Sequence, residues 1–480
     1  MMDIELIQLV ESVKKCKCES NYTEIKSAQN GCPKLYDTFS AFSNQSGGGK
    51  IIFGMDEDNF EVCGVYDAAD LQKRIMEQSL QMEPVIRPLC TVADIDGKVV
   101  VCAEIQEIDK FEKPCFYKGA GRLRGSYVRV GDGDRRMTEY EVYSYEVYRK
   151  KIQDELRIVE NGSISDIDTP AYRDYVALLK DKKPNLASQS VERIRQLQGF
   201  AVGEKPTIAG AMLFSEYPQM YYPQLCITAV SVPGTEMSSL GSVGERFIDN
   251  RRIDGPLVQM LDDALTFVRK NMRTKTIIDP VTGKRSDKTE YPIVAVRELL
   301  INALVHRDYS IYTDCTPVTV KMFRDRMEIE NPGALFGRIT LDKLGMFSAD
   351  TRNPFIANAL EIMGETENRY SGIPTVYAMM NEAGLPVPKF ESEMGVFRVT
   401  LYNDLNSSGR PVTDDTKKEI LAFCSVPRSR SEIESLFNGR MTISYVMNKY
   451  VHTMVAEGLL TLTMPDKPKS KNQKYVSAIK

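Results

Sequence analysis

Several features that mark other protein classes are missing from this 480-residue sequence. No run of apolar residues is long enough to span a bilayer, so no membrane-spanning segment is expected. No Gly-x-x-x-x-Gly-Lys-Ser/Thr loop occurs, which excludes a P-loop motor. The ten cysteines include one Cys-x-Cys, at Cys16 and Cys18, and no second pair with zinc-site spacing follows it. A structural zinc site is therefore not expected.

The sequence has no excess of positive charge. Its 62 Lys and Arg residues are outnumbered by 66 Asp and Glu residues, which gives a formal net charge of −4. This balance argues against a globally basic nucleic-acid-binding protein, but it leaves room for local basic patches, which act within a screening length. The first residues carry acidic side chains and lack a signal-peptide pattern, so we expect a cytoplasmic protein.

The residues that are present predict an α+β protein with several domains. A hydrophobic fraction of 42% and a charged fraction of 27% are ordinary for a globular protein, and the chain is too long for one core. Apolar periodicity and polar, turn-rich stretches divide the sequence into regions. They are an α/β domain at 1–158, a linker at 159–170, a mixed α/β connecting segment at 171–290, an α/β domain at 291–403 and a small domain at 415–480.

The stretch RELLINALVHRDYS, residues 297–310, raises the first question of function. Glu298, Asn302 and His306 recur every fourth residue on a predicted helix that spans about 292–308 and is otherwise apolar. Four residues correspond to about 400° of helical rotation, so these side chains form one narrow polar stripe. An ordinary solvated helix edge is one interpretation. A site is the other, because Glu can polarise water and Asn can offer an oxygen to Mg²⁺.

Two glycine-containing turns follow this helix. One ends a predicted strand at Asn331-Pro332-Gly333, and the other opens a predicted helix at Ser371-Gly372. A turn that opens a helix presents backbone N–H groups and the positive end of the helix dipole, which suit phosphate. Together with the polar stripe, these turns predict a site for Mg²⁺ and a triphosphate.

Residues 291–403 resemble the GHKL (Bergerat-fold) ATP-binding domain, an α/β sandwich. The resemblance implies Glu298 as general base, Asn302 as Mg²⁺ ligand, and His306, Asn331, Gly333, Ser371 and Gly372 at the nucleotide. Two positions depart from the family. Asn331 replaces the Asp that accepts the adenine amino group, and Tyr370 stands where glycine is common. The resemblance therefore implies ATP and Mg²⁺ binding and leaves hydrolysis open.

The predicted strand YTEIKSA near the start carries charged residues on one face. Glu24 and Lys26 lie on this strand, Glu19 just before it, and Asp56 after the later strand KIIFGM. From the pattern alone, ordinary charge alternation on a half-exposed strand is the favoured explanation. The glycines 47–49 can cradle phosphate or make a tight helix-to-strand turn, and the turn is favoured.

Most of residues 12–150 resemble the Schlafen/AlbA-type domain, through E-I-K, A-F-S-N, G-G and I-I-F-G-M-D. The resemblance implies nucleic-acid binding or, in Schlafen proteins, a metal-dependent endoribonuclease. Carried over, it gives Glu19, Glu24 and Asp56 as ligands of Mg²⁺ or Mn²⁺ and Lys26 as a phosphate contact. Further candidate phosphate contacts, with ordinary solvation as the alternative, are Arg122, Arg124, Arg129, Arg135 and Arg136.

Residues 415–480 predict three helices followed by a hairpin, the pattern of a winged helix-turn-helix. The predicted recognition-helix residues are Thr442, Ser444, Tyr445 and Asn448, and the predicted wing lysines are Lys467, Lys469, Lys471 and Lys474. DNA binding is favoured, although winged helices also bind proteins and lysine-rich tails are commonly only solvated.

Three functions are compatible with this sequence. The first is an ATP-responsive regulator that binds DNA or RNA through its N-terminal domain and its winged helix. The second is a metal-dependent endoribonuclease gated by nucleotide, and the third is a non-catalytic assembly protein whose folds are relics. A homodimer is expected only by analogy with GHKL proteins.

Overall fold

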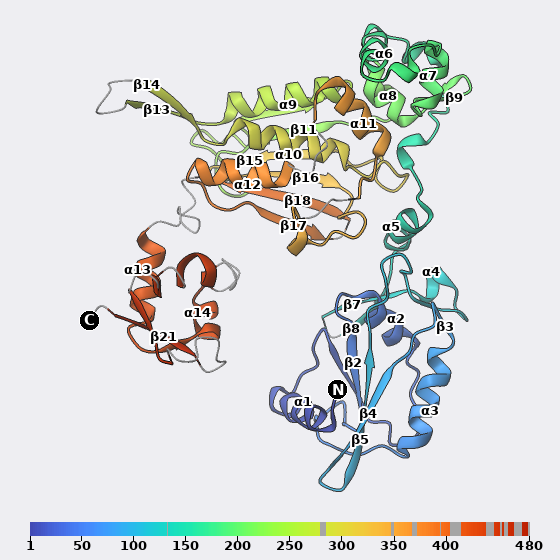
Figure 1. Ribbon diagram of the computed structural model, residues 1–480, viewed down its shortest axis with the longest axis vertical. Helices are drawn as coiled ribbons and strands as arrows, with labels where there is room; N and C mark the ends of the chain where they lie inside the picture. Colours follow the sequence, from blue (N-terminus) through green and yellow to red (C-terminus); the bar gives the residue numbers. More distant parts are fainter. Residues whose placement is uncertain are drawn as a thin grey trace.

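The computed structural model describes residues 1–131, 133–278, 285–346, 350–366, 372–393, 395–403, 414–437, 446–451, 454–455, 459–464 and 473–478. These residues form an N-terminal, a central and a C-terminal part (Figure 1). Each part has its own buried apolar clusters, and the N-terminal part has one on each face of its sheet. The expected α+β, multidomain fold class is confirmed. None of the helices in the described ranges is both long and apolar enough to cross a membrane.

The N-terminal part is built on a four-stranded sheet with the order β1-β2-β5-β4, in which only β1 and β2 are parallel. Alternate residues of β2 face opposite cores: Ile51 and Phe53 pack with α2 and α3, whereas Ile52 packs with α1. The elements are α1 (Asp3–Cys16), β1 (Thr23–Lys26), α2 (Tyr36–Asn44), β2 (Gly49–Phe53), α3 (Ala68–Ser79), β3 (Met82–Glu83), β4 (Leu89–Ile95), β5 (Lys98–Ile105), β6 (Phe116–Tyr117), α4 (Arg122–Gly125), β7 (Tyr127–Val130), β8 (Gly133–Arg136) and α5 (Glu139–Lys150).

The motif residues around α2 hold this part together. Buried Asn44 accepts a hydrogen bond from Cys115 N (2.7 Å) and donates to the carbonyl oxygens of Cys115 (2.9 Å) and Tyr127 (3.1 Å). Gly48 has φ +69°, and a Cβ there would lie 2.1 Å from Ile105 O. The glycines therefore make a tight turn against β5, as favoured from the sequence.

The central part contains a six-stranded sheet with the order β12-β11-β15-β16-β18-β17, and α9 and α10 pack on it (Figure 1). Its strands are β11 (Ile227–Ser231), β12 (Asp249–Ile253), β15 (Val318–Met322), β16 (Arg326–Pro332), β17 (Lys389–Glu393) and β18 (Val396–Tyr402). Its helices are α9 (Leu257–Asn271), α10 (Ile293–Val305), α11 (Pro354–Met363) and α12 (Gly372–Glu382), with a short turn η5 (Leu341–Lys343). A separate hairpin is formed by β13 (Thr274–Ile278) and β14 (Arg285–Thr289).

The domain boundary expected at residue 290 is wrong. Strand β11, which precedes that boundary, pairs in parallel with β15, which follows it, through the register Ile227↔Val318. The expected linker is also packed, because Val159 and Ile167 are buried in the central core. The remaining elements of this stretch are η1 (Asp154–Leu156), η2 (Ile164–Asp166), α6 (Pro170–Lys182), η3 (Pro184–Leu186), α7 (Val191–Leu197), β9 (Ala201–Val202), β10 (Lys205–Pro206), α8 (Ile208–Phe214) and η4 (Pro218–Met220).

The C-terminal part has a small core and a three-stranded sheet with the order β19-β21-β20. Its elements are α13 (Asp414–Phe423), β19 (Arg428–Ser429), α14 (Arg430–Phe437), the turn η7 (Met447–Val451), β20 (Leu460–Leu462) and β21 (Lys474–Ser477). The start of the expected third helix lies outside the described residues, so the winged helix stays a prediction.

Candidate functional site

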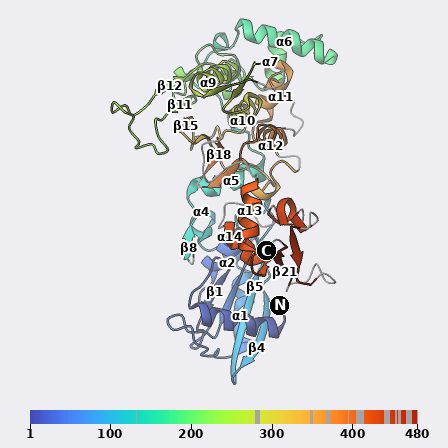
Figure 2. The same ribbon diagram turned by 90° about the vertical axis from the view of Figure 1, so that its left-hand side faces the viewer.

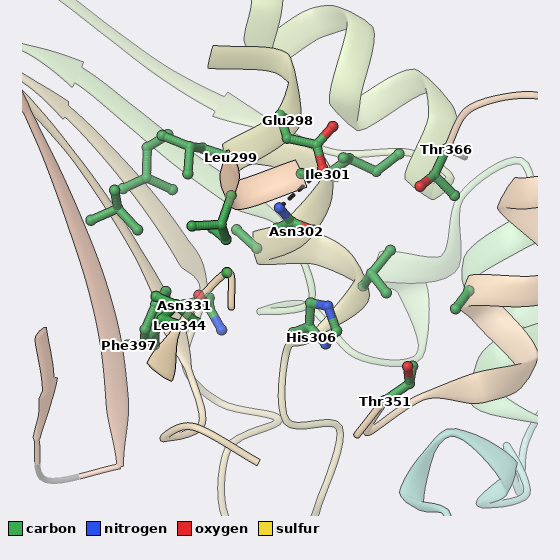
Figure 3. Close-up of a pocket in the computed structure, with 18 of the residues that line it drawn as sticks. Glu298, Leu299, Ile301, Asn302, His306, Asn331, Leu344, Thr351, Thr366 and Phe397 are labelled. Carbon is green, nitrogen blue, oxygen red and sulfur yellow. Dashed lines mark hydrogen bonds between the residues drawn. The ribbon is translucent and has the colours of Figure 1, made fainter. Parts of the chain in front are cut away.

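A cavity of about 480 Å³ opens between α10, the sheet strands β16 and β18, and the start of α12 (Figure 3). Pockets that bind small ligands have volumes of this order, about 300–1,000 Å³. The structure brings the predicted GHKL-like residues together around this cavity, except Ser371, which lies outside the described residues. They are Glu298, Asn302, His306, Asn331, Gly333 and Gly372.

Glu298 and Asn302 lie one turn apart on α10, and both are only half-buried on a helix whose other residues from Ala295 to Val305 are mostly buried. Asn302 Nδ2 donates a hydrogen bond to Glu298 Oε1 at 3.2 Å (Figure 3). No hydrogen bond to Asn302 Oδ1 is formed within the described ranges. This amide oxygen therefore fits Mg²⁺, which prefers oxygen ligands.

The first turn of α12 lies directly against this pair. A Cβ added at Gly372 would be 2.1 Å from Glu298 Oε1 and 3.2 Å from Asn302 Nδ2. A side chain at this position would displace the Glu298 carboxylate or the first turn of α12 from its present place. Because glycine has none, the positive end of the α12 dipole and its first N–H groups lie beside the carboxylate and the amide.

His306 lies just after the helix, because α10 ends at Val305, and the expected polar stripe is thus two residues long. The His306 backbone N–H donates to Asn302 O at 2.9 Å. Burial, together with the positive charge of Arg352, lowers the pKa of His306 to about 4. The imidazole is therefore neutral at physiological pH and can donate or accept one hydrogen bond at the cavity.

Asn331 and Gly333 form the turn after β16. Asn331 is buried and lines the cavity near Phe397 (Figure 3). Ile329 and Val399 also line the cavity. Gly333 has φ +107°, and a Cβ there would lie 2.9 Å from Asp308 Cβ, so the turn requires glycine. These apolar neighbours suit a flat aromatic ring system, and the Asn331 amide can form a hydrogen bond to a polar atom on the edge of that ring.

Sequence reasoning missed a buried charge pair behind this turn. Asp308 and Arg352 form an ion pair at 3.2 Å, with side chains that are 1% and 5% exposed. Asp308 also accepts hydrogen bonds from Ser310 N (2.8 Å) and from the hydroxyl of Tyr140 on α5 (2.8 Å). No local pattern could find Arg352 and Tyr140 as partners, because 44 and 168 residues separate them from Asp308 along the chain.

The N-terminal carboxylates surround an arginine. The Arg129 side chain is 1% exposed and contacts Glu24 (2.5 Å), Asp134 (3.0 Å) and Glu19 (3.5 Å). Thr38 donates a further hydrogen bond to Asp134 at 2.7 Å. Burial raises the pKa values of Glu19 and Asp134. The guanidinium therefore supplies the positive charge that a metal ion would supply among these carboxylates.

The expected metal centre at Glu19, Glu24 and Asp56 is not assembled. Asp56 instead accepts hydrogen bonds from the backbone N–H groups of Asp58 (3.0 Å) and Asn59 (3.1 Å) in the turn after β2. Among the described residues, no three His, Cys, Asp or Glu side chains are grouped so that they could hold a metal ion. Arg129 occupies the place of a metal ion among the carboxylates, and it lies opposite Asp134 in the register of the β7–β8 hairpin.

Most of the predicted phosphate contacts in the N-terminal part already have acidic partners. Lys26 pairs with Glu24 at 2.9 Å, Arg135 with Glu141 at 2.6 Å, and Arg122 with Glu146. Arg129 is buried, which is a correction to its expected role as a phosphate contact. Arg124 and Arg136 are exposed and form no ion pair with any residue that the structure describes.

The predicted C-terminal contacts are mostly beyond the described ranges. Lys474 is exposed on β21, and Asn448 lies in η7, with its side chain outside the description. The others outside it are Thr442, Ser444, Tyr445, Lys467, Lys469 and Lys471.

Two stretches of the chain match known protein families, as the resemblances predicted. Residues 316–401 match the HATPase_c_4 family, described as "Putative ATP-dependent DNA helicase recG C-terminal". Residues 19–138 match the family described as "Schlafen, AlbA_2". The chain is thus similar to these families over the strands that carry Asn331 and over the N-terminal carboxylates. A search of curated proteins finds no significant match.

This chain also matches solved structures, and two of them match very different shares of it. The DIP2311 protein from Corynebacterium diphtheriae is 17% identical, with 92% of this chain and 91% of that chain covered and a TM-score of 0.39. The N-terminal domain of a putative ATP-dependent DNA helicase RecG-related protein from Nitrosomonas europaea is 23% identical. That match covers 27% of this chain and 92% of the domain, with a TM-score of 0.22.

Proposed function

We propose that this protein binds ATP with Mg²⁺ in the cavity beside α10 and binds nucleic acid through its outer parts, and thereby acts as an ATP-responsive regulator. The observation that carries the proposal is the pair Glu298 and Asn302, which lines the cavity beside the first turn of α12. The match of residues 316–401 to an ATPase-type family supports nucleotide binding. The match of residues 19–138 to the Schlafen, AlbA_2 family supports association with nucleic acid.

Each part of the cavity would serve a different part of the nucleotide. The apolar wall of Ile329, Phe397 and Val399 suits the base, and Asn331 offers it one donor and one acceptor. The start of α12 suits phosphate. The Asn302 oxygen would hold Mg²⁺, which when bound neutralises phosphate charge and polarises a phosphoryl oxygen. Glu298, oriented by the Asn302 amide, is placed to accept a proton from an attacking water.

Nucleic acid would be held at two places. On the N-terminal part, the exposed Arg124 and Arg136 suit phosphates. The C-terminal part would act as a winged helix, with the candidate residues between Thr442 and Asn448 in a groove and Lys474 with its neighbouring lysines on the backbone. The metal-dependent nuclease is not proposed, because Arg129 lies among the carboxylates that would bind the metal ion.

The test is the melting temperature of the full chain with ATP and MgCl₂. Saturating ligand at a hundredfold excess over Kd stabilises a protein by about 2.7 kcal/mol, so the wild type should melt several degrees higher. Asn302→Ala should lose the Mg²⁺-dependent part of the shift. Asn358→Ala, on α11 and outside the cavity, removes a comparable amide and should keep it. If neither ATP nor ADP shifts the melting temperature of the wild type at millimolar concentration, nucleotide binding is overturned, and the alternative of a non-catalytic assembly protein with relic folds is favoured.

Nucleic-acid binding is tested separately, by fluorescence anisotropy of labelled DNA and RNA. The proposal expects binding that weakens with salt and no cleavage in the presence of Mn²⁺. Mn²⁺-dependent cleavage that disappears in Glu24→Gln would restore the nuclease and overturn the regulator.

A further inference from the structure

One wall of the cavity is held from outside by the N-terminal part. This wall consists of residues 333–346 and 350–352, which we call the cavity segment. Inside, it contributes Gly333, Phe336, Leu344 and Thr351 to the lining of the cavity. Outside, it meets α5, which lies between the N-terminal and the central part in both views (Figures 1 and 2).

The first contact runs from α5 to the buried ion pair. The Tyr140 hydroxyl donates to Asp308 Oδ2 at 2.8 Å, and Asp308 pairs with Arg352 at 3.2 Å. Arg352 in turn donates to the carbonyl oxygen of Ala334 at 3.0 Å, so both ends of the cavity segment are tied to one charge pair. Because this pair is buried, its geometry responds strongly to the loss of a hydrogen-bond partner.

The second contact holds the other side of the cavity segment. The Tyr148 hydroxyl donates to Asp350 Oδ2 at 2.9 Å, and the same oxygen accepts the backbone N–H of Arg338 at 3.1 Å. The Tyr148 ring stands edge-on to Phe336, with ring centroids 5.4 Å apart. Asp350 and Phe336 both line the cavity, so Tyr148 contacts two lining residues from behind.

The third contact comes from the loop after β5. Lys110 Nζ donates to the carbonyl oxygens of Gly337 and Ile339, each at 3.2 Å. The neighbouring ring of Phe111 stacks on Tyr148, with centroids 4.7 Å apart, and lies 4.4 Å from the Arg338 guanidinium carbon. Residues from two separate elements of the N-terminal part therefore bracket the cavity segment.

The same helix is joined to the proposed nucleic-acid surface. Arg135 on β8 pairs with Glu141 on α5 at 2.6 Å, and Glu141 also accepts the backbone N–H of Thr138 at 2.7 Å. Arg136 lies on β8, three residues before the first residue of α5. A continuous set of contacts thus leads from β8 through α5 to the cavity.

We propose that Tyr140 and Tyr148 are positioning residues of the nucleotide site, so that nucleotide binding in the cavity and nucleic-acid binding on the N-terminal part are energetically coupled. This inference rests on the proposed function. A nucleotide that fills the cavity fixes the cavity segment, and the cavity segment fixes α5 and the hairpin that carries Arg136. Coupling between two sites is reciprocal: the factor by which ATP changes DNA affinity equals the factor by which DNA changes ATP affinity.

The experiment measures both factors on the full chain. The affinity for a fluorescein-labelled random-sequence DNA duplex is measured with and without ATP and MgCl₂, and the affinity for ATP with and without the duplex. For the wild type we expect the two factors to be equal and between about fivefold and 150-fold. In Tyr140→Phe/Tyr148→Phe both factors should fall towards one, while each ligand alone still binds.

Tyr172→Phe is the matched control, because it also removes one tyrosine hydroxyl, which donates to Val191 O at 2.9 Å far from the cavity segment. It should keep the wild-type factors. Tyr148→Phe alone, at a more exposed tyrosine, serves if the double variant does not fold. The inference would be overturned if a folded Tyr148→Phe protein kept the wild-type coupling factors. It would also be overturned if the wild type bound both ligands but both of its coupling factors were equal to one. Absence of ATP binding in the wild type would instead overturn the proposed function.

Discussion

Arg129 shows most clearly how the structure changes the interpretation of a single residue. In the sequence it is one of five arginines that could meet phosphate, whereas in the structure its side chain is buried and contacts Glu19, Glu24 and Asp134. Removing one partner from a buried ion cluster leaves the others without compensation, which costs much more than the cluster itself contributes. Arg129 therefore acts as an internal cation that holds β7 and β8 to β1.

Replacement of Arg129 should destabilise the protein strongly. We expect Arg129→Met to lower the free energy of unfolding by about 3–5 kcal/mol, because the buried carboxylate of Glu24 and the partly buried carboxylate of Asp134 lose their counter-charge. The measurement is urea unfolding at neutral pH. Arg135→Met is the control: its ion pair with Glu141 is half-exposed and should be worth about 1 kcal/mol or less. Equal, small losses in both variants would show that the buried cluster is not structural.

At the scale of residues, the sequence predicts those parts of the site that are local. Glu298 and Asn302 could be found because both lie on one helix at a spacing that fixes their common face. The contact between Glu24 and Arg129 joins residues 105 positions apart, and that between Tyr140 and Asp308 joins residues 168 positions apart. Such long-range contacts depend on how strands pair and how the parts of the molecule pack against each other. The periodicity of a local sequence does not determine this arrangement.

At the scale of elements, the close approach of the first turn of α12 to Glu298 depends on the lack of a side chain at Gly372. Gly372→Ala places a Cβ 2.1 Å from Glu298 Oε1, so either the carboxylate or the first turn of α12 must move. We expect ATP with MgCl₂ to shift the melting temperature of this variant by less than half the wild-type shift, with the fold intact. Gly133→Ala, in a strand at the N-terminal hairpin with free space around it, is the control and should keep the full shift. A wild-type shift in Gly372→Ala would separate α12 from the nucleotide.

The start of α11 gives a pH-dependent prediction. The buried Glu155 carboxylate accepts the N–H groups of Phe355 (3.0 Å) and Ile356 (2.8 Å), and burial raises its pKa from 4.5 to about 7. Between these two pH values the folded state holds a proton that the unfolded state has lost. Stability therefore falls as pH rises from 4.5 to 7, by about 3 kcal/mol in total, and the loss is complete above pH 7.

Glu155→Gln removes this titration while it keeps one oxygen for the helix. We expect the free energy of unfolding of the variant to increase relative to that of the wild type by about 3 kcal/mol between pH 4.5 and pH 7, because the variant does not share the loss of stability. Urea unfolding at several pH values measures the difference, in which contributions from other groups cancel. Glu160→Gln, at an exposed carboxylate, is the control and should show a flat difference. A flat difference for Glu155→Gln as well would mean that helix α11 compensates the buried charge fully.

Individual helices and strands follow the local periodicity of apolar residues, whereas the pairing of strands in a sheet does not. The buried residues Leu6, Val10 and Val13 recur at helical spacing in α1 (Asp3–Cys16), and the alternation of residues in β2 matches the two cores that it faces. By contrast, β11 pairs with β15 across some 90 residues of chain, so a boundary placed by composition at residue 290 divided one sheet. Parallel pairing of distant strands is a property of the whole core.

For the whole molecule, a net charge of −4 means that a polyanion is not attracted at long range. Any affinity for nucleic acid must come from cations within a Debye length, about 8 Å at physiological ionic strength, of the phosphates. Pairing reduces what an arginine can contribute, because its charge is already compensated. On the N-terminal part, we therefore expect the phosphate contacts to come from Arg124 and Arg136, near the base of the β7–β8 hairpin.

The salt dependence of binding tests this directly. Each phosphate contact contributes about 0.9 to the slope of log K against log salt concentration on duplex DNA, so Arg124→Ala/Arg136→Ala should reduce the slope by about two. Affinity at low salt should fall by a similar proportion for every DNA sequence, because phosphate contacts carry no sequence information. Arg74→Ala/Arg173→Ala removes two exposed arginines that are paired with acidic residues, and its slope should stay within error of the wild type. If the two double variants have the same slope, the N-terminal part does not hold the nucleic acid at these arginines, and the C-terminal part alone must account for binding.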